Sequence, residues 1–148
     1  MVPAIVFEVG VSYDIVRRTF RAAMVQLDDL LKKAGSDDRI VAVLLYGSRA
    51  RGDARPESDT DVCLVLSPSR DARERAAPVQ LDYLEFSQLD VRVFQALPLY
   101  VRQRILKDGK VLLATNEDAL YEVAFRTIRA WEDFRPFYHA YLQEIADG

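Results

Sequence analysis

The chain has 148 residues, of which 50% are hydrophobic and 29% are charged, a balance that is ordinary for one globular domain with a hydrophobic core. The formal net charge of −3 argues against a general nucleic-acid-binding protein, which needs a clustered positive surface. A single cysteine excludes an internal disulfide and a cysteine-based zinc cluster, and no apolar run approaches the length of a membrane span. Since residues 1–10 also lack the basic start of a signal peptide, we expect a single cytoplasmic domain over residues 1–148 that binds neither nucleic acid nor membrane directly.

The first predicted elements are an N-terminal arm and an amphipathic helix. Residues 1–11 are apolar but contain a proline and a glycine, which favours an extended arm or a short added strand over a helix. Between residues 13 and 34, apolar positions recur at intervals of three and four, which predicts an amphipathic helix with Ser12 as a cap at its start and Gly35 at its end. The apolar stripe that we expect to pack on a sheet consists of Val16, Phe20, Ala23, Met24, Leu27, Leu30, Leu31 and Ala34.

The next segment, Ile40 to Leu45, is continuously aliphatic, which is typical of a strand buried on both faces. It ends abruptly at Tyr46-Gly47-Ser48. Glycine lets the backbone approach a ligand without interference from a Cβ atom, and Ser48 can cap a following short helix whose free N–H groups attract anions. The end of this strand is therefore a candidate phosphate-binding site.

Two carboxylates stand at the start of the second predicted strand. Asp59 and Asp61 are two residues apart, so the pleat of a strand places both side chains on one face, where they repel each other. A divalent cation would relieve that repulsion, and an oxygen-only ligand set favours a hard ion such as Mg²⁺. Cys63, further along the same strand, is expected to be a buried and inert thiol.

A competing phosphate-binding motif can be excluded at this point. Gly47 and Gly52 have the glycine spacing of a P-loop, which continues with Lys and then Ser or Thr. The residues in those places are Asp53 and Ala54. The sequence thus disfavours a P-loop ATPase or kinase and favours a mechanism based on carboxylates and metal ions.

The middle of the chain leaves one assignment open. The charged segment 67–75 is expected to be an exposed loop or a short surface helix. Residues 79–86 alternate as in a strand but also suit a helical turn, so both remain possible. Residues 89–97 alternate more clearly and predict a half-buried strand, with Asp90 on the polar face that looks into the site. Periodicity alone allows three residues as a further acidic site residue, namely Asp82, Glu85 and Asp90.

The last third of the chain is predicted to be mostly helical. Residues 99–106 are predicted to form a short helix and residues 111–114 a strand or an extended segment. Neither segment carries residues to which we assign chemistry. Residues 116–147 form a C-terminal helical segment with Asn116 as its cap. Its expected packing stripe is Leu120, Val123, Ala124 and Ile128.

The C-terminal segment carries five large rings within eleven residues, more than one helix face can readily bury in so small a domain. They surround Pro136, where the helix is expected to kink or restart. Packing in the core and docking of a partner protein are both open readings of these rings. His139, the only histidine, has no companion for a metal site or a Ser-His-Asp hydrolase. The rings are Trp131, Phe134, Phe137, Tyr138 and Tyr141.

Gly47-Ser48, followed after ten residues by Asp59-Thr60-Asp61, resembles the signature of the minimal nucleotidyltransferase domains, relatives of the polymerase β superfamily. Leu89-Asp90-Val91 resembles the later strand that carries the family's third carboxylate, and the resemblance covers about residues 13–146. It implies the polymerase β-type α/β fold, a small mixed sheet with helices packed on one side, with the active site at the end of the first two strands.

The resemblance implies nucleotidyl transfer and assigns roles to the motif residues. The triphosphate of ATP would lie over Gly47 and Ser48, and two Mg²⁺ ions would be held by the three aspartates, which favours Asp90 over Asp82 as the third ligand. By the same resemblance, Asp90 helps to deprotonate the acceptor hydroxyl. Arg49 and Arg51 are candidate phosphate contacts. The three implied metal ligands and catalytic residues are Asp59, Asp61 and Asp90.

Stand-alone domains of this size resemble the antitoxins of HEPN/MNT toxin–antitoxin pairs, which silence an all-helical ribonuclease toxin by adding AMP from ATP to a tyrosine. The resemblance therefore implies a HEPN toxin as partner, in a hetero-oligomer. Two other functions stay open: a small-molecule nucleotidyltransferase of the kind that modifies aminoglycosides, and a non-catalytic antitoxin that acts by binding alone. The first of these usually has a further substrate domain, for which 148 residues leave little room.

Overall fold

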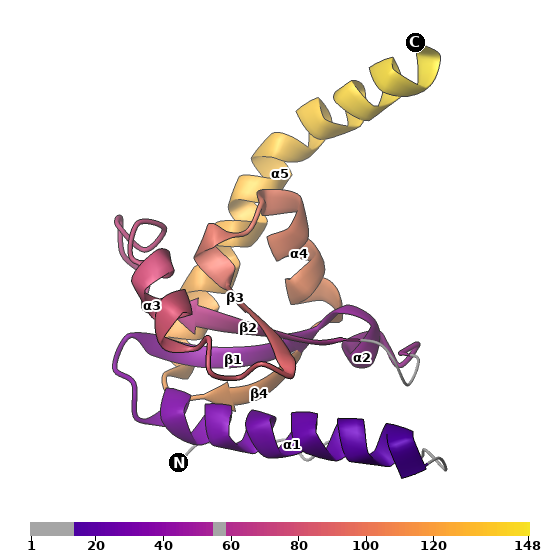
Figure 1. Cartoon of the computed structure of the whole chain (residues 1–148). Helices are drawn as coiled ribbons and strands as arrows, with labels where there is room; N and C mark the ends of the chain where they lie inside the picture. Colours follow the sequence, from indigo (N-terminus) through magenta and orange to yellow (C-terminus); the bar gives the residue numbers. More distant parts are fainter. Residues whose placement is uncertain (1–13, 55–58) are drawn as a thin grey trace.

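The computed structural model describes residues 14–54 and 59–148, and its centre is a four-stranded sheet (Figure 1). The strands are β1 (Ile40–Tyr46), β2 (Thr60–Leu66), β3 (Leu89–Val93) and β4 (Lys110–Ala114), and they lie in the order β3-β2-β1-β4. β1 pairs antiparallel with both β2 and β4, whereas β2 and β3 are parallel. The predicted α/β fold with a mixed sheet is confirmed.

Helix α1 (Asp14–Gly35) lies along one face of this sheet (Figure 1). The predicted stripe is confirmed where its side chains are described, because Ala23, Leu27, Leu30 and Ala34 are buried in the core on this face. Met24 and Leu31 pack against the same core, and the helix ends at Gly35 as predicted. The predicted arm over residues 1–11, the cap at Ser12 and the side chains of Val16 and Phe20 fall outside the residues described.

The opposite face is covered by α4 (Leu99–Asp108) and α5 (Glu117–Asp147). A second core joins their buried side chains Ile105, Leu120 and Val123 to this side of the sheet. The helices therefore lie on both faces, which corrects the expectation that they pack on one side. The physical reason is visible in β1, whose first six residues are all buried, because a strand that is apolar on both faces needs a cover on each.

The segment between β2 and β3 resolves the open assignment. Residues 76–82 form the short helix α3 (Ala76–Asp82), and residues 83–85 form turns, so residues 79–86 contain no strand. β3 then ends at Val93, earlier than the predicted end at residue 97, and the 3-10 helix η1 (Phe94–Ala96) follows. Gln95 fixes this change of direction, because its side-chain amide binds both the N–H and the C=O of Leu66, at 3.1 and 2.8 Å.

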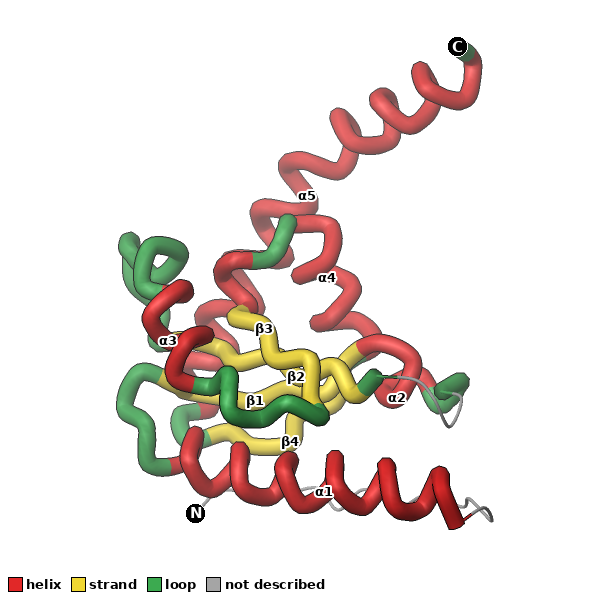
Figure 2. The backbone as a smooth tube through the Cα atoms, in the orientation of Figure 1, coloured by secondary structure: helices red, strands yellow, loops and turns green. Residues whose placement is uncertain are grey.

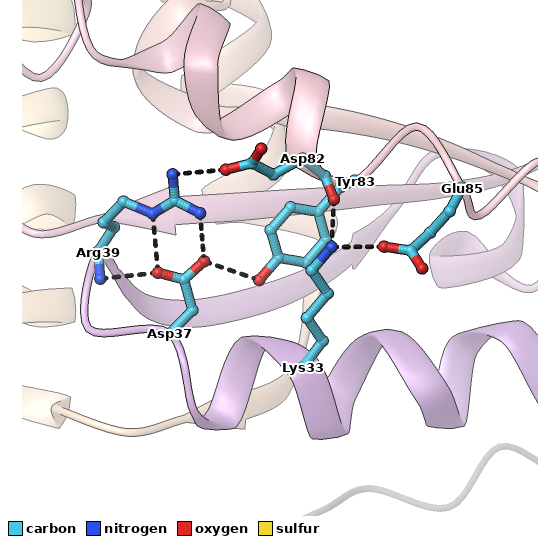
Figure 3. A network of polar contacts seen from close by, with 6 residues as sticks. All are labelled: Lys33, Asp37, Arg39, Asp82, Tyr83 and Glu85. Carbon is cyan, nitrogen blue, oxygen red and sulfur yellow. Dashed lines mark hydrogen bonds and ion pairs between the residues drawn. The ribbon is translucent and has the colours of Figure 1, made fainter.

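A polar network joins the end of α1 and the loop after it to the end of α3 (Figure 3). Arg39 lies at its centre and forms ion pairs with Asp37 at 2.7 Å and with Asp82 at 2.8 Å. The Tyr83 hydroxyl donates a hydrogen bond to Asp37, and the Lys33 ammonium contacts the Glu85 carboxylate. Two of the residues considered as a third site carboxylate, Asp82 and Glu85, therefore bind neighbouring cations in this network.

Helix α5 has 31 residues and includes Pro136. The helix therefore does not end and restart at this proline, which was one of the two predicted possibilities. Its start is capped as predicted, since the Asn116 side chain accepts a hydrogen bond from the backbone N–H of Ala119. Figures 1 and 2 show its C-terminal half projecting beyond the sheet and α4. Ile128, predicted in the packing stripe, is 49% exposed, and Thr127 is buried instead, with its hydroxyl bonded to the Val123 carbonyl.

Within residues 14–54 and 59–148, no helix combines the length and apolar character needed to cross a membrane.

Candidate active site

Three polar side chains stand in a row across neighbouring strands at one end of the sheet. In the strand pairing, Tyr46 of β1 is opposite Asp61 of β2, and Asp61 is opposite Asp90 of β3. Residues opposite each other in a sheet point to the same face. That face is the one covered by α4 and α5, because Tyr46 packs against the core on that side. The structure thus brings together two of the three carboxylates predicted from the sequence, although they are 29 positions apart in the chain.

The surroundings of Asp61 disfavour its negative charge. Burial, the charges of Asp90 and Asp59, and a hydrogen bond with Asp90 raise the pKa of Asp61 to about 6. A carboxyl group with a raised pKa is one whose negative charge is unfavourable in its surroundings. Burial, followed by the charges of Cys63, Asp61 and Asp90, raises the pKa of Tyr46 well above its usual range. The site is therefore electrostatically strained in a way that a bound cation would relieve.

The carboxylate oxygens suit Mg²⁺, which usually binds through one or two protein carboxylates together with substrate phosphates. Asp59 lies just before β2 with an exposed side chain, and among the residues described here no three acidic, histidine or cysteine side chains are gathered closely enough to hold a metal ion. Asp90 also forms a 2.9 Å ion pair with Arg92. The arrangement thus offers the Asp61–Asp90 pair as the core of a metal site, with Asp59 beside it.

Gly47 follows β1 directly and begins the short helix α2 (Gly47–Arg51). Its φ angle of +72° lies in the left-handed region, which favours glycine. A Cβ atom on this residue would stand only 2.3 Å from Oδ2 of Asp61, which is closer than two such atoms can approach. The close approach at Gly47 is therefore an approach of the Asp61 carboxylate itself, which takes the place that a Cβ atom of this residue would occupy.

The other predicted phosphate contacts, Ser48, Arg49 and Arg51, lie on α2, and each already forms a polar contact within the protein. Ser48 stands in the first turn, and its carbonyl accepts the backbone N–H of Asp53 at 3.1 Å. Arg49 donates from Nε to the Thr60 hydroxyl at 3.1 Å, which ties α2 to the start of β2. Arg51 forms an exposed ion pair with Asp53 at 3.3 Å. Of these residues, Arg51 faces the hollow described next.

A cavity of about 210 Å³ lies next to Gly47, and its second wall is α4. It is lined by Tyr46, Gly47, Arg51, Val101, Arg104, Ile105 and Asp108. The sequence of this helix showed no chemistry, and the structure adds that the helix supplies one wall of the cavity. Four of the lining residues recur at three- and four-residue spacing on α4, which signals a common helix face. Nothing in the sequence indicated that this face lies against the end of β1.

The remaining residues singled out from the sequence lie away from this site. Asp82 and Glu85 belong to the network around Arg39. Cys63 is fully buried, as predicted, and burial raises the pKa of its thiol above the usual range. His139 is exposed on the projecting half of α5, where its ring contacts that of Tyr138.

Comparison with known proteins identifies the family. Residues 26–118 match the sequence model of the family described as "Polymerase beta, Nucleotidyltransferase". A protein of Methanocaldococcus jannaschii that is named "Putative protein adenylyltransferase" is 30% identical over 95 residues, which cover 64% of this chain and 72% of that protein.

Solved structures share the fold. A chain in the crystal structure of a toxin–antitoxin pair with AMP-PNP matches with a TM-score of 0.59 at 20% identity, covering 82% of this chain and 97% of that one. A chain in the complex of tri-AMPylated Shewanella oneidensis HEPN toxin with MNT antitoxin matches with a TM-score of 0.55 at 14% identity, covering 86% of this chain and 98% of that one. The predicted family is confirmed: this chain belongs to the polymerase β nucleotidyltransferases.

Proposed function

We propose that this protein is the antitoxin of a toxin–antitoxin pair and that it transfers AMP from ATP to a tyrosine of a HEPN-type toxin. The family membership supports nucleotidyl transfer. The assignment of the Methanocaldococcus jannaschii relative supports a protein as acceptor, and the fold shared with chains of toxin–antitoxin complexes, one of them with an AMPylated HEPN toxin, supports the kind of partner. The protein then works in a hetero-oligomer with its toxin, in the cytoplasm, where ATP is available.

One observation carries the catalytic part of this proposal. Asp61 and Asp90 are opposite each other in the pairing of β2 with β3, and Gly47 lies against the Asp61 carboxylate. These residues place two carboxylates at one end of the sheet, next to the cavity that Gly47 lines. We assign Asp59, Asp61 and Asp90 as ligands of Mg²⁺, with two ions as the family resemblance implies, and Gly47 and Ser48 as the backbone that receives the triphosphate. Bound Mg²⁺ would orient the phosphates and stabilise negative charge on the attacking and leaving oxygens.

The reaction is a displacement at the α-phosphorus of ATP. The tyrosine oxygen forms a bond to that phosphorus, the bond between the phosphorus and the pyrophosphate oxygen breaks, and pyrophosphate leaves. Asp90 accepts the proton of the tyrosine hydroxyl, the role that the family resemblance implies for it. Arg49 and Arg51 stay assigned as phosphate contacts, the first of them also holding α2 against β2.

The experiment that tests the proposal compares ATP labelled at the α-phosphate with ATP labelled at the γ-phosphate. With Mg²⁺ and the purified toxin encoded beside this protein, label from the α position should appear on the toxin and label from the γ position should not. Chelation of Mg²⁺ should abolish the labelling. Label on an aminoglycoside but never on the toxin would contradict the proposal in favour of a small-molecule transferase, and no label on any acceptor would contradict catalysis altogether.

A further inference from the structure

The cavity between the end of β1 and α4 opens on the same face of the sheet as the paired carboxylates. Tyr46 connects the two, because it is opposite Asp61 in the strand pairing and also lines the cavity. Gly47 does the same, since it lies against the Asp61 carboxylate and contributes to the cavity wall. The cavity is therefore separated from the Asp61 carboxylate only by residues that contact both.

The walls of the cavity differ in character. Val101 and Ile105 of α4 make one part of it apolar, and Tyr46 adds an aromatic ring. Two guanidinium groups, from Arg51 at the end of α2 and Arg104 on α4, line the same hollow together with one carboxylate, that of Asp108, and Arg51 also pairs with Asp53, which does not line it. Arg104 forms no ion pair with any side chain in the described parts of the chain, so its charge is available to a ligand.

Resting on the proposed function, we propose that Arg104 binds the polyphosphate of the nucleotide across the cavity from Arg51. A guanidinium group binds phosphate oxygens through two parallel hydrogen bonds, and such charge-assisted bonds are roughly twice as strong as neutral ones. The acceptor tyrosine does not explain the arrangement, because a neutral phenol gains little from two cations. α4 is thereby a second nucleotide-binding element, brought to the motif by the fold and separated from Gly47 by more than fifty positions of sequence.

The test measures nucleotide binding by the full chain rather than transfer. ATP and adenosine are titrated, in the presence of Mg²⁺, into the wild-type protein and into Arg104→Ala, Arg104→Lys and Lys107→Ala. Lys107 is the matched control, because it is an exposed cation on the same helix that does not line the cavity. Arg104→Ala should weaken ATP binding about tenfold or more and leave adenosine binding unchanged. Arg104→Lys should recover part of the loss, and Lys107→Ala should bind ATP like the wild type.

Two results would overturn the inference. Arg104→Ala could bind ATP as tightly as the wild type, or it could lose ATP and adenosine equally, which would indicate damage to the fold rather than loss of a phosphate contact. The outcome is separable from that of the proposed function. Arg104-dependent ATP binding without label on the toxin supports the inference and contradicts protein AMPylation, whereas labelled toxin with an unaffected Arg104→Ala variant contradicts the inference alone.

Discussion

Gly47, the first residue of α2, lies against Asp61 of β2 so closely that a Cβ atom at Gly47 would lie 2.3 Å from Oδ2 of Asp61. Glycine is needed directly after β1 for two reasons, its backbone angle and the lack of room for a Cβ atom, and the second reason is specific to this position. Gly52 has a similar angle, with φ of +80° against +72° at Gly47, but a Cβ atom there would meet no atom within 4 Å. Substitutions at the two glycines can therefore separate two effects. Both would strain the backbone, but only a side chain at Gly47 would collide with the Asp61 carboxylate.

The first prediction compares alanine at these two positions. Gly47→Ala should abolish AMP transfer, because the new methyl group displaces the Asp61 carboxylate or fills the space beside it. Gly52→Ala should cost about 1 kcal/mol of stability from the left-handed backbone and keep transfer close to the wild-type rate. Transfer assays and urea unfolding of both variants check this. Equal loss of transfer in the two variants would show that only the backbone conformation matters.

The second prediction concerns the carboxylate pair. Asp61→Asn and Asp90→Asn should both abolish transfer, and Asp61→Asn should raise the stability of the metal-free protein at pH 7 by about 1 kcal/mol or more. The sign follows from the raised pKa: above pH 6 the folded protein carries a charge at Asp61 that the unfolded chain accommodates more easily. Urea unfolding at pH 7 and transfer assays measure the two effects.

Asp82→Asn is the control for this pair, because Asp82 lies in the network around Arg39 rather than at the site. It should keep full transfer activity. Active Asp90→Asn together with inactive Asp82→Asn would move the third carboxylate to Asp82.

The third prediction is a dependence of stability on acid. The hydrogen bonds and charge of Arg39 lower the pKa of Asp37 from 3.8 to about 2. Asp37 therefore stabilises the fold when it is ionised in both states, and this contribution is fully present above pH 4 and is lost as the pH falls toward 2. Its side chain is only 11% exposed, and the shift corresponds to about 2 kcal/mol.

Urea unfolding of Asp37→Asn should accordingly show a loss of about this size at pH 7 and little loss near pH 2. Asp38→Asn, which changes the exposed neighbouring carboxylate, should leave stability nearly unchanged at both values. A loss in Asp37→Asn that persists undiminished at low pH would show that the carboxylate charge is not its origin.

The fourth prediction places the toxin on the projecting half of α5. The aromatic side chains there divide into two groups, because Trp131, Phe134 and Tyr138 contact one another and Tyr138 stacks on Tyr100 of α4. The other rings, Phe137 and Tyr141, are 71% and 59% exposed. The first group supports the helix where it leaves the domain, so the exposed rings are the better candidates for contact with a partner.

Phe137→Ala and Tyr141→Ala should each weaken the complex with the toxin, by about 2 kcal/mol or more where the ring is a central anchor. Leu81→Ala is a matched control, since Leu81 is exposed on α3. Calorimetric titration of the toxin with each variant measures the effect. Equal affinity of all three variants and the wild type would show that this part of α5 is not the docking surface.

Local patterns in the sequence predicted the elements that one stretch of chain determines by itself. The stripe of α1, the cap at Asn116 and the aliphatic run of β1 are of this kind. The relation of Asp90 to Asp61 was suggested by family resemblance, because the parallel pairing of β2 with β3 joins segments separated by α3 and is invisible to periodicity.

Other features depended on packing between distant segments and were missed. Arg104 lines the cavity only because α4 returns to the end of β1, where Gly109 packs against the Leu45 carbonyl. Thr127 replaced Ile128 in the buried stripe of α5 because its hydroxyl is satisfied within the helix, at 2.8 Å from the Val123 carbonyl. Neither relationship has a signature in the local order of residues.

Under the proposed function, a covalent change silences the toxin, and the binding of this protein alone does not. The most direct measurement incubates the toxin with this protein, ATP and Mg²⁺, removes this protein, and then determines the ribonuclease activity and the mass of the toxin. We expect a toxin that stays inactive and carries AMP on a tyrosine, and an active, unmodified toxin when Asp61→Asn is used instead. A toxin that regains full activity once the wild-type protein is removed, or that Asp61→Asn silences equally well and as lastingly, would contradict the proposed function.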